Sequence, residues 1–222
     1  MLYYEYIPKL IQDCISAHPE TAFFYTILAD FYALDQQYIL ARDYYLKAIV
    51  FDSNTSILWE RAIYMSLLEQ DYKKTIIDSN LAIDLFPLQG NLYYYKGLAE
   101  FYEKDYNESI QTLNNALLYI LDDAGLLSGI YEALGNAYHT LAEQDSSAIY
   151  HSKSDESYEK ALEYDPKNIY ILNTDGNVTS IDKNSFKINW KKQIFSNEID
   201  FPNLGSIVAQ LNSNNLFLHN GG

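Results

Sequence analysis

The sequence predicts a mainly α-helical protein made of stacked helical hairpins, with a short β-rich segment at its C-terminal end. Apolar residues recur at helical spacing through residues 59–87, on both sides of a break at Gln70-Asp71. The landmarks of this stretch return 34 residues before it and 34 after it. Beyond residue 168 the apolar spacing changes to that of strands. Because one hairpin cannot bury its own apolar face, the repetition predicts that the hairpins stack on one another.

Composition and charge exclude several classes of protein. The 222 residues are 48% hydrophobic and 15% aromatic, which is too apolar for a disordered polymer. The formal net charge is −15, and residues 169–222 carry four acidic and four basic side chains, so the excess of acid lies in residues 1–168. Nucleic acid and anionic membranes attract basic surfaces, so neither is an expected partner.

The sequence gives few signals of compartment. No apolar run is long enough to span a bilayer, and the N-terminal residues lack the basic and apolar regions of a signal peptide. The single cysteine, Cys14, excludes an internal disulfide and falls on an apolar helical stripe, as a packed thiol would. We therefore expect a soluble protein, with its compartment left open.

Three kinds of landmark define the repeat. The break is followed by a tyrosine at Tyr38, Tyr72 and Tyr106, and ten residues later by a small residue at Ala48, Ala82 and Ala116. An aromatic residue that would fit between paired helices stands upstream, at Tyr25, Trp59 and Tyr93. Small residues let two helices of a hairpin approach closely, so the alanines are predicted to lie where the helices touch.

This pattern resembles the tetratricopeptide repeat family, whose 34-residue signature combines an aromatic residue, Leu-Gly, Tyr, Ala and Pro. The resemblance implies a right-handed α-α superhelix over residues 1–168. Its units would be a half-repeat at 1–21 and repeats at 22–55, 56–89, 90–123 and 128–168. The last repeat is opened by Gly135 and closed by Pro166, with an insertion around 143–154 that predicts longer helices or a projecting loop.

Residues 169–222 form the predicted β-rich segment. Short apolar runs alternate with turns at Asp175-Gly176 and Lys183-Asn184, which predicts antiparallel hairpins. With Trp190 after the third run, the segment resembles one incomplete blade of a pyrroloquinoline-quinone-type β-propeller. A single blade cannot close a ring, so the resemblance implies no quinone cofactor and no quinone-dependent enzyme.

No pattern in the sequence predicts catalysis or a cofactor. The four histidines, His18, His139, His151 and His219, share no metal-ligand spacing such as i, i+4, so no metal site is predicted. No glycine-rich phosphate-binding loop occurs, and the carboxylates are expected to form a solvated acidic face.

The resemblance to tetratricopeptide repeats also predicts a binding surface. In that family the first helix of each hairpin lines a concave groove. The matching positions here are Asp30, Glu60, Tyr64, Tyr94, Leu98, Glu132 and Asn136, and the next turn adds Leu68, Phe101, Tyr102 and His139. A clamp for a carboxylate would need several basic residues, whereas this groove offers Arg61 and Lys96.

We therefore expect a non-enzymatic scaffold that binds a peptide or protein segment with basic and apolar side chains in an acidic, tyrosine-rich groove. The alternative is a structural spacer or anchor that carries the truncated propeller module, in a chimeric or fragment chain. The sequence does not distinguish an oligomer from a monomer.

Overall fold

The structure is a computed structural model that describes the backbone of residues 2–145, 148–164, 168–172, 177–182, 188–193, 207–212 and 215–220. Side chains are described for residues 6–145 and 148–164. The chain divides into two units, Met1–Ser157 and Tyr158–Gly222. Each unit is described by itself.

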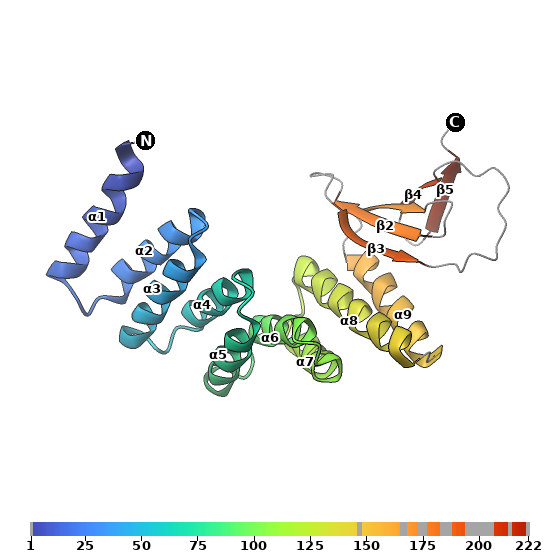
Figure 1. Ribbon diagram of the computed structural model, residues 1–222, viewed down its shortest axis with the longest axis horizontal. Coiled ribbons are helices and arrows are strands. Elements are labelled where there is room, and N and C mark those ends of the chain that lie inside the picture. The colour runs from blue at the N-terminus through green and yellow to red at the C-terminus, as the bar shows by residue number, and fades with distance from the viewer. Residues whose placement is uncertain are drawn as a thin grey trace. The chain divides into compact units, whose positions relative to one another are not determined.

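Short helices recur in pairs through the first unit (Figure 1). Helix α1 covers Leu2–Ala17, and the pairs that follow are α2 and α3 (Ala22–Leu34, Tyr38–Phe51), α4 and α5 (Ser56–Leu68, Tyr72–Leu85), and α6 and α7 (Gly90–Tyr102, Tyr106–Tyr119). The first helices of these pairs begin 34 residues apart, and so do the second helices. Each pair lies within one predicted repeat, so the period of the sequence is also the period of the structure.

Each turn inside a hairpin uses one residue with a left-handed backbone. These residues are Gln36, Gln70 and Lys104, with φ of 58°, 61° and 72°. At the second turn the backbone N–H of Asp71 donates to the Ser66 carbonyl at 3.0 Å, and that of Gln70 donates to the Leu67 carbonyl at 3.0 Å. This pair of bonds is the Schellman motif, which satisfies the last carbonyls of a helix. The break seen in the sequence is therefore a helix end with a fixed geometry.

Replacing Gln70 by glycine is expected to raise the free energy of unfolding by about 0.5 to 1 kcal/mol. A side chain in the left-handed region costs about 1–2 kcal/mol, and glycine removes this cost while losing part of the gain to its freer unfolded chain. The midpoint of thermal unfolding by circular dichroism should rise by about 1 to 3 °C. Gln70→Ala keeps a Cβ and is the matched control. An equal rise of the unfolding midpoint in both variants would contradict the idea that the left-handed backbone at residue 70 is strained by its side chain.

The core of each hairpin is built on the predicted small residues. Ala48, Ala82 and Ala116 are fully buried. In the third hairpin Gly97 faces Leu113, and a Cβ added to Gly97 would lie 2.7 Å from Leu113 Cγ. The two helices of this hairpin therefore touch at a place where a hydrogen atom fits and a methyl group does not.

The aromatic residues upstream of the breaks have a polar role as well as a packing role. The Tyr25 hydroxyl donates to the carbonyl of residue 19 at 2.8 Å, Trp59 Nε1 to that of residue 53 at 3.2 Å, and the Tyr93 hydroxyl to that of residue 87 at 2.9 Å. Each bond runs from a first helix to the connection that precedes it. These aromatic-to-carbonyl bonds therefore fix the joints between successive hairpins.

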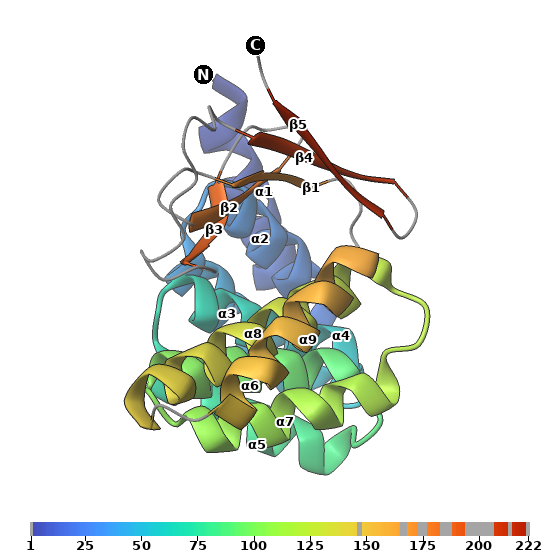
Figure 2. The ribbon, with the colours of Figure 1, turned by 90° about the vertical axis from the view of Figure 1, so that its right-hand side faces the viewer.

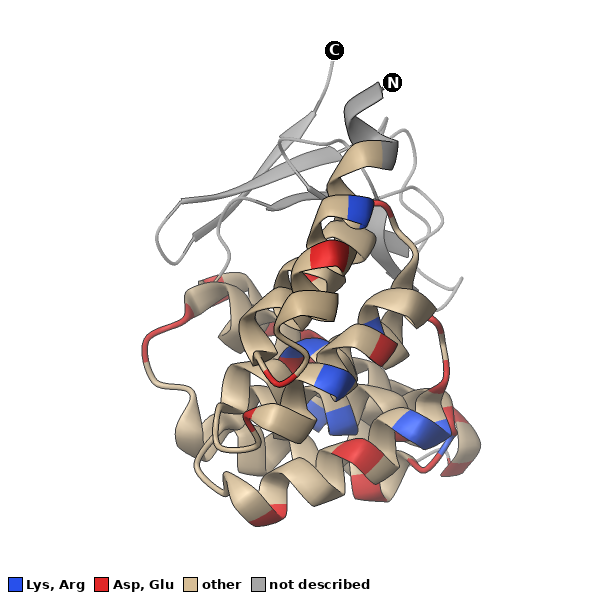
Figure 3. Ribbon diagram, turned by 90° about the vertical axis from the view of Figure 1, so that its left-hand side faces the viewer, with Lys and Arg blue, Asp and Glu red and all other residues tan. Residues whose placement is uncertain are grey.

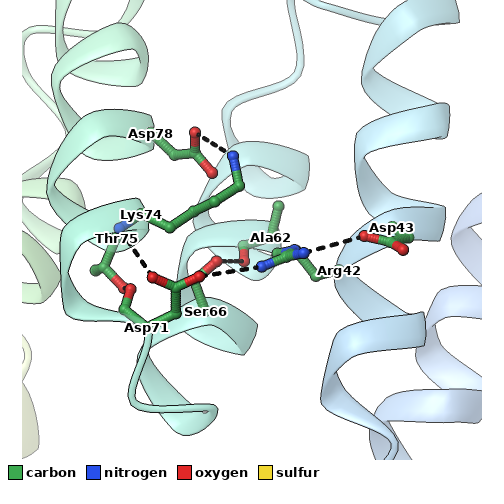
Figure 4. Close-up of polar contacts among 8 residues, drawn as sticks. All are labelled: Arg42, Asp43, Ala62, Ser66, Asp71, Lys74, Thr75 and Asp78. Atoms are coloured by element: carbon green, nitrogen blue, oxygen red, sulfur yellow. Dashed lines mark hydrogen bonds and ion pairs between the residues drawn. The ribbon is translucent and has the colours of Figure 1, made fainter.

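An ion pair between Arg42 and Asp71 joins the second hairpin to the first (Figure 4). Asp71 caps α5 by accepting a hydrogen bond from the backbone N–H of Lys74 at 3.2 Å, and its carboxylate lies 3.8 Å from Arg42 Nη1 of α3. Arg42 also lies 3.3 Å from Asp43 Oδ1. The N-capping carboxylate of α5 in the second hairpin thus lies close to a positive charge on α3 of the first hairpin.

Helices α8 (Ala124–Asp145) and α9 (Ala148–Tyr164) are longer than the others, with 22 and 17 residues. Of the two outcomes predicted for the insertion around 143–154, the structure therefore has longer helices. Helix α8 begins before the predicted start of its repeat at 128. The Asp123 carboxylate accepts from the backbone N–H of Leu126 at 3.0 Å, as an N-capping residue does. Among the described helices, none combines the length and the apolar composition that a bilayer crossing needs.

The strands described in the second unit are β1 (Asn168–Leu172), β2 (Asn177–Asp182), β3 (Ile188–Gln193), β4 (Ile207–Asn212) and β5 (Asn215–Asn220). They pair antiparallel in the order β3-β2-β1-β4-β5. A propeller blade is a sheet of four strands, whereas the described strands form one sheet of five. The described sheet therefore differs from the predicted single blade. The predicted turns at Asp175-Gly176 and Lys183-Asn184, the side chain of Trp190 and the closing Pro166 lie outside the described residues.

Candidate functional site

The residues predicted to line a groove lie on the first helices of successive hairpins. Asp30 is on α2, Glu60 and Tyr64 on α4, Tyr94 and Leu98 on α6, and Glu132 and Asn136 on α8. Helix α6 contacts both α4 and α8. The structure thus brings residues from three hairpins onto neighbouring helices.

Asp30 is engaged within the array. Its carboxylate accepts hydrogen bonds from the Tyr45 hydroxyl and from Arg61 Nη1, the latter at 2.8 and 3.2 Å. Burial, followed by this hydrogen bond to Asp30, raises the pKa of Tyr45 above its ordinary value. The negative charge of Asp30 is therefore shared with a cation from the next hairpin.

Glu60 lies deeper than a solvated acid would. It is 7% exposed, and its carboxylate accepts a hydrogen bond from Asn91 Nδ2 of α6 at 2.8 Å. The described ion pairs give Glu60 no lysine or arginine within bonding distance. It therefore places negative charge beneath the surface instead of at its edge.

Tyrosine rings gather beside Glu60. The ring centroids of Tyr64 and Tyr95 are 5.4 Å apart, and those of Tyr94 and Tyr95 are 5.8 Å apart. At the C-terminal end of α6, Tyr102 stacks on Tyr72 with centroids 4.8 Å apart. Tyr64 is 40% exposed and Tyr102 54% exposed, so both offer ring surface to solvent. We call four of these tyrosines and two acidic side chains the tyrosine surface: Glu60, Tyr64, Tyr94, Tyr95, Tyr102 and Glu132.

The acid groups act on the tyrosines electrostatically. Burial raises the pKa of Tyr94 above its ordinary value, and the negative charge of Glu132 raises it further. Burial also raises the pKa of Tyr95 to about 12, with a further contribution from Glu60. Both phenols therefore stay neutral at physiological pH, and the surface combines neutral rings with carboxylates.

Tyr94 is held by its contact with α8. A Cβ added to Gly129 would lie 2.6 Å from the Tyr94 hydroxyl oxygen, so the ring tip lies directly against the helix at this glycine. Leu98, one turn further along α6, packs against the buried cluster formed by α7 and α8, as Tyr94 does. Tyr94 and Leu98 thus join α6 to α8, while Tyr64 and Tyr102 remain the more exposed members.

Both basic residues near the predicted groove are paired. Arg61 pairs with Asp30, and Lys96 Nζ lies 3.6 Å from the Glu100 carboxylate. An additional carboxylate from a ligand would have to compete with these internal partners, so the arrangement does not favour a carboxylate clamp.

Two features of the site were missed by sequence reasoning. Tyr95 was left out because family positions were used, although the run Tyr93-Tyr94-Tyr95 marks it. The grouping of His139, a predicted groove residue, with Glu143 and His151 was also missed, because the spacing among the histidines alone carries no sign of it. The structure brings ligand atoms of all three within 4.8 Å of one another.

Comparisons with known proteins identify the fold. No family model and no curated protein matches the chain. Among solved structures, "Crystal structure of MamA" is similar with a TM-score of 0.62 and 16% identity, over 74% of this chain and 90% of that one. "MamA 41-end from Desulfovibrio magneticus RS-1" matches with a TM-score of 0.59 and 16% identity, over 72% and 85%.

A structure titled as a tetratricopeptide domain is also similar. The Sgt2 TPR domain from Aspergillus fumigatus matches with a TM-score of 0.50 and 16% identity, over 57% of this chain and 83% of that one. The predicted tetratricopeptide-like helical fold is therefore confirmed. These similarities do not support the predicted resemblance of residues 169–222 to a β-propeller.

Proposed function

We propose that the helical array is a non-enzymatic scaffold that binds a peptide or protein segment of basic and apolar character on the tyrosine surface. The observation that carries this proposal is the group of tyrosines on α4 and α6, in which Tyr64 contacts Tyr95 and Tyr95 contacts Tyr94. Tyr102 lies further along α6, and the carboxylates of Glu60 and Glu132 act on the buried rings. Tyrosine supplies a large amphipathic contact area at low entropic cost, which is why it is enriched in interaction hot spots.

The charge balance of the first unit favours a basic partner. Acidic residues are spread over helices and turns of this unit (Figure 3), and the formal net charge of the chain is −15. A lysine or arginine side chain can lie over a neutral tyrosine ring and approach a carboxylate at the same time. Apolar side chains of the same segment would cover the ring faces.

The members of the predicted groove have different roles in this proposal. Tyr64 and Tyr102 would contact the partner through their exposed rings, and Glu132 would attract its cations. Glu60 would strengthen the negative potential from below. Asp30, Leu98 and Asn136 would form the margins of the surface, with Asp30 first giving up part of its pairing with Arg61.

The proposal is tested with a fluorescein-labelled peptide in which lysine and leucine alternate. Fluorescence polarisation should show binding that weakens as salt is added, because salt screens exposed charges. Tyr64→Ala combined with Tyr102→Ala should weaken it by about ten-fold or more, the effect of losing roughly 1.4 kcal/mol from aromatic hot spots. Glu132→Gln should also weaken binding.

Matched controls distinguish this surface from a general acidic or aromatic effect. Tyr6→Ala removes a ring that is 63% exposed on α1, and Glu108→Gln removes an exposed acid on α7. Equal losses in these controls, or equal binding of a glutamate–leucine peptide, would contradict the proposal. Charge reversal at Glu60 is a poor test, because a lysine there would be buried against Asn91 and could unfold the hairpin.

A further inference from the structure

Three side chains that can bind a metal ion meet at the end of the α8–α9 hairpin. None of them belongs to the tyrosine surface, and the inference drawn from them does not depend on the proposed function. They are His139 and Glu143 of α8 and His151 of α9, and one ligand atom from each lies within 4.8 Å of the other two. His139 is partly buried, and Glu143 and His151 are exposed. No other residues in the described part of the chain form such a group of three.

The local structure explains why the three meet. His139 and Glu143 are four residues apart on one helix, so both point from the same face one turn apart. His151 follows in the first part of α9, which belongs to the same unit as α8 and lies beside it (Figure 2). The extra length of this last hairpin, relative to the 34-residue repeat, is what carries Glu143 and His151 beyond the regular array.

The beginning of α9 is held against α8 by contacts that do not involve the three ligands. The Ser154 hydroxyl donates to the Gly135 carbonyl at 3.1 Å and is fully buried. The rings of Tyr138 and Tyr150 stack with centroids 6.2 Å apart. The backbone that carries His151 is therefore positioned by packing, which is the preorganisation that a binding site needs.

The ligand set specifies the class of ion. Two imidazole nitrogens and one carboxylate oxygen are a combination that zinc takes in proteins, with a water or another ligand in the fourth position. Ca²⁺ and Mg²⁺ prefer sites made of oxygen atoms, so a set with two histidines disfavours them. Zinc bonds of about 2.0–2.1 Å place ligand atoms roughly 3.4 Å apart. The three ligand atoms lie within 4.8 Å of one another, so the exposed Glu143 and His151 side chains need to close by up to about 1.4 Å.

We propose that His139, Glu143 and His151 form a binding site for a divalent transition-metal ion of the zinc class. The ion would link α8 to α9 at the point where the array departs from its regular period. Because the three ligands come together in the folded hairpin, binding would stabilise the folded state.

The proposal is tested on the full chain without a histidine tag. Calorimetric titration with ZnCl₂ should show one site per chain, whereas MgCl₂ should give no binding. Co²⁺ should produce the visible absorption of a low-symmetry, four-coordinate complex, which reports on ligand geometry and not on stability. Zinc should raise the midpoint of thermal unfolding, and a chelator should reverse the rise.

Variants assign the ligands. His151→Ala and Glu143→Gln alter exposed side chains and should leave the circular dichroism spectrum unchanged while weakening zinc binding by more than about ten-fold, since even outer partners of zinc ligands have effects of that size. His18→Ala, an exposed histidine next to α1, is the matched control and should bind zinc as the parent does. Absence of zinc binding in the parent, or affinity unchanged by His151→Ala, would overturn the proposal.

Discussion

Replacing Leu113 by alanine is expected to lower the free energy of unfolding by about 2 to 5 kcal/mol, the range for removing a fully buried leucine. Leu113 has no exposed surface, and it packs in the cluster that joins α7 to α8. Urea unfolding followed by circular dichroism measures the loss. Leu118→Ala changes a leucine of the same helix that is 66% exposed, and should change the free energy of unfolding by less than about 0.5 kcal/mol.

Leu113 should also determine whether the substitution Gly97→Ala stabilises or destabilises the protein. In the parent, an alanine at Gly97 would place its Cβ 2.7 Å from Leu113 Cγ and Cδ2, and overpacking of this kind costs about 1–3 kcal/mol. In the Leu113→Ala background the space is open, so the alanine should stabilise α6 by up to about 1 kcal/mol through helix propensity. An equal effect of Gly97→Ala in both backgrounds would show that the two residues do not meet.

Replacing Asp30 by alanine is expected to lower the free energy of unfolding by about 1–3 kcal/mol. The loss comes mainly from the Tyr45 hydroxyl, because Tyr45 is 2% exposed and would lose the carboxylate that accepts its hydrogen bond. The ion pair with Arg61 adds little, since both side chains are more than 40% exposed and solvent screens them.

A double-mutant cycle isolates this contribution. In a Tyr45→Phe background the donor is absent, so Asp30→Ala should cost less than it does in the parent, as chemical denaturation would show. Asp43→Ala removes a solvated acid paired with Arg42 and should change the free energy of unfolding by less than about 1 kcal/mol. An identical cost of Asp30→Ala in both backgrounds would contradict the role of the hydrogen bond.

The period, the helix pairs and the small contact positions could be predicted because they follow from local pattern. Landmarks such as Tyr72 and Ala82 recur at a fixed spacing, and each has a physical role that depends on near neighbours. The left-handed residue in each turn was not predicted, since the position holds glutamine or lysine instead of the glycine that would mark it.

The site was predicted less fully than the fold. Family positions placed Tyr64, Tyr94 and Glu132 on neighbouring helices, but they did not reveal that Glu60 is buried or that Asp30 binds Arg61. The Asp30–Arg61 ion pair and the Glu60–Asn91 hydrogen bond each join residues about one repeat apart, so each depends on the rotation between successive hairpins. Such rotations are set by packing, which a single-sequence pattern does not report.

The aromatic-to-carbonyl bonds have a kinetic consequence. Each joins residues only six positions apart, so a joint can close with a small loss of chain entropy before any distant segment arrives. Arrays built from such local contacts nucleate in any repeat and grow to both sides. Stretched from its ends, the helical array would therefore come apart one joint after another, and each released hairpin would leave its neighbours able to capture it again.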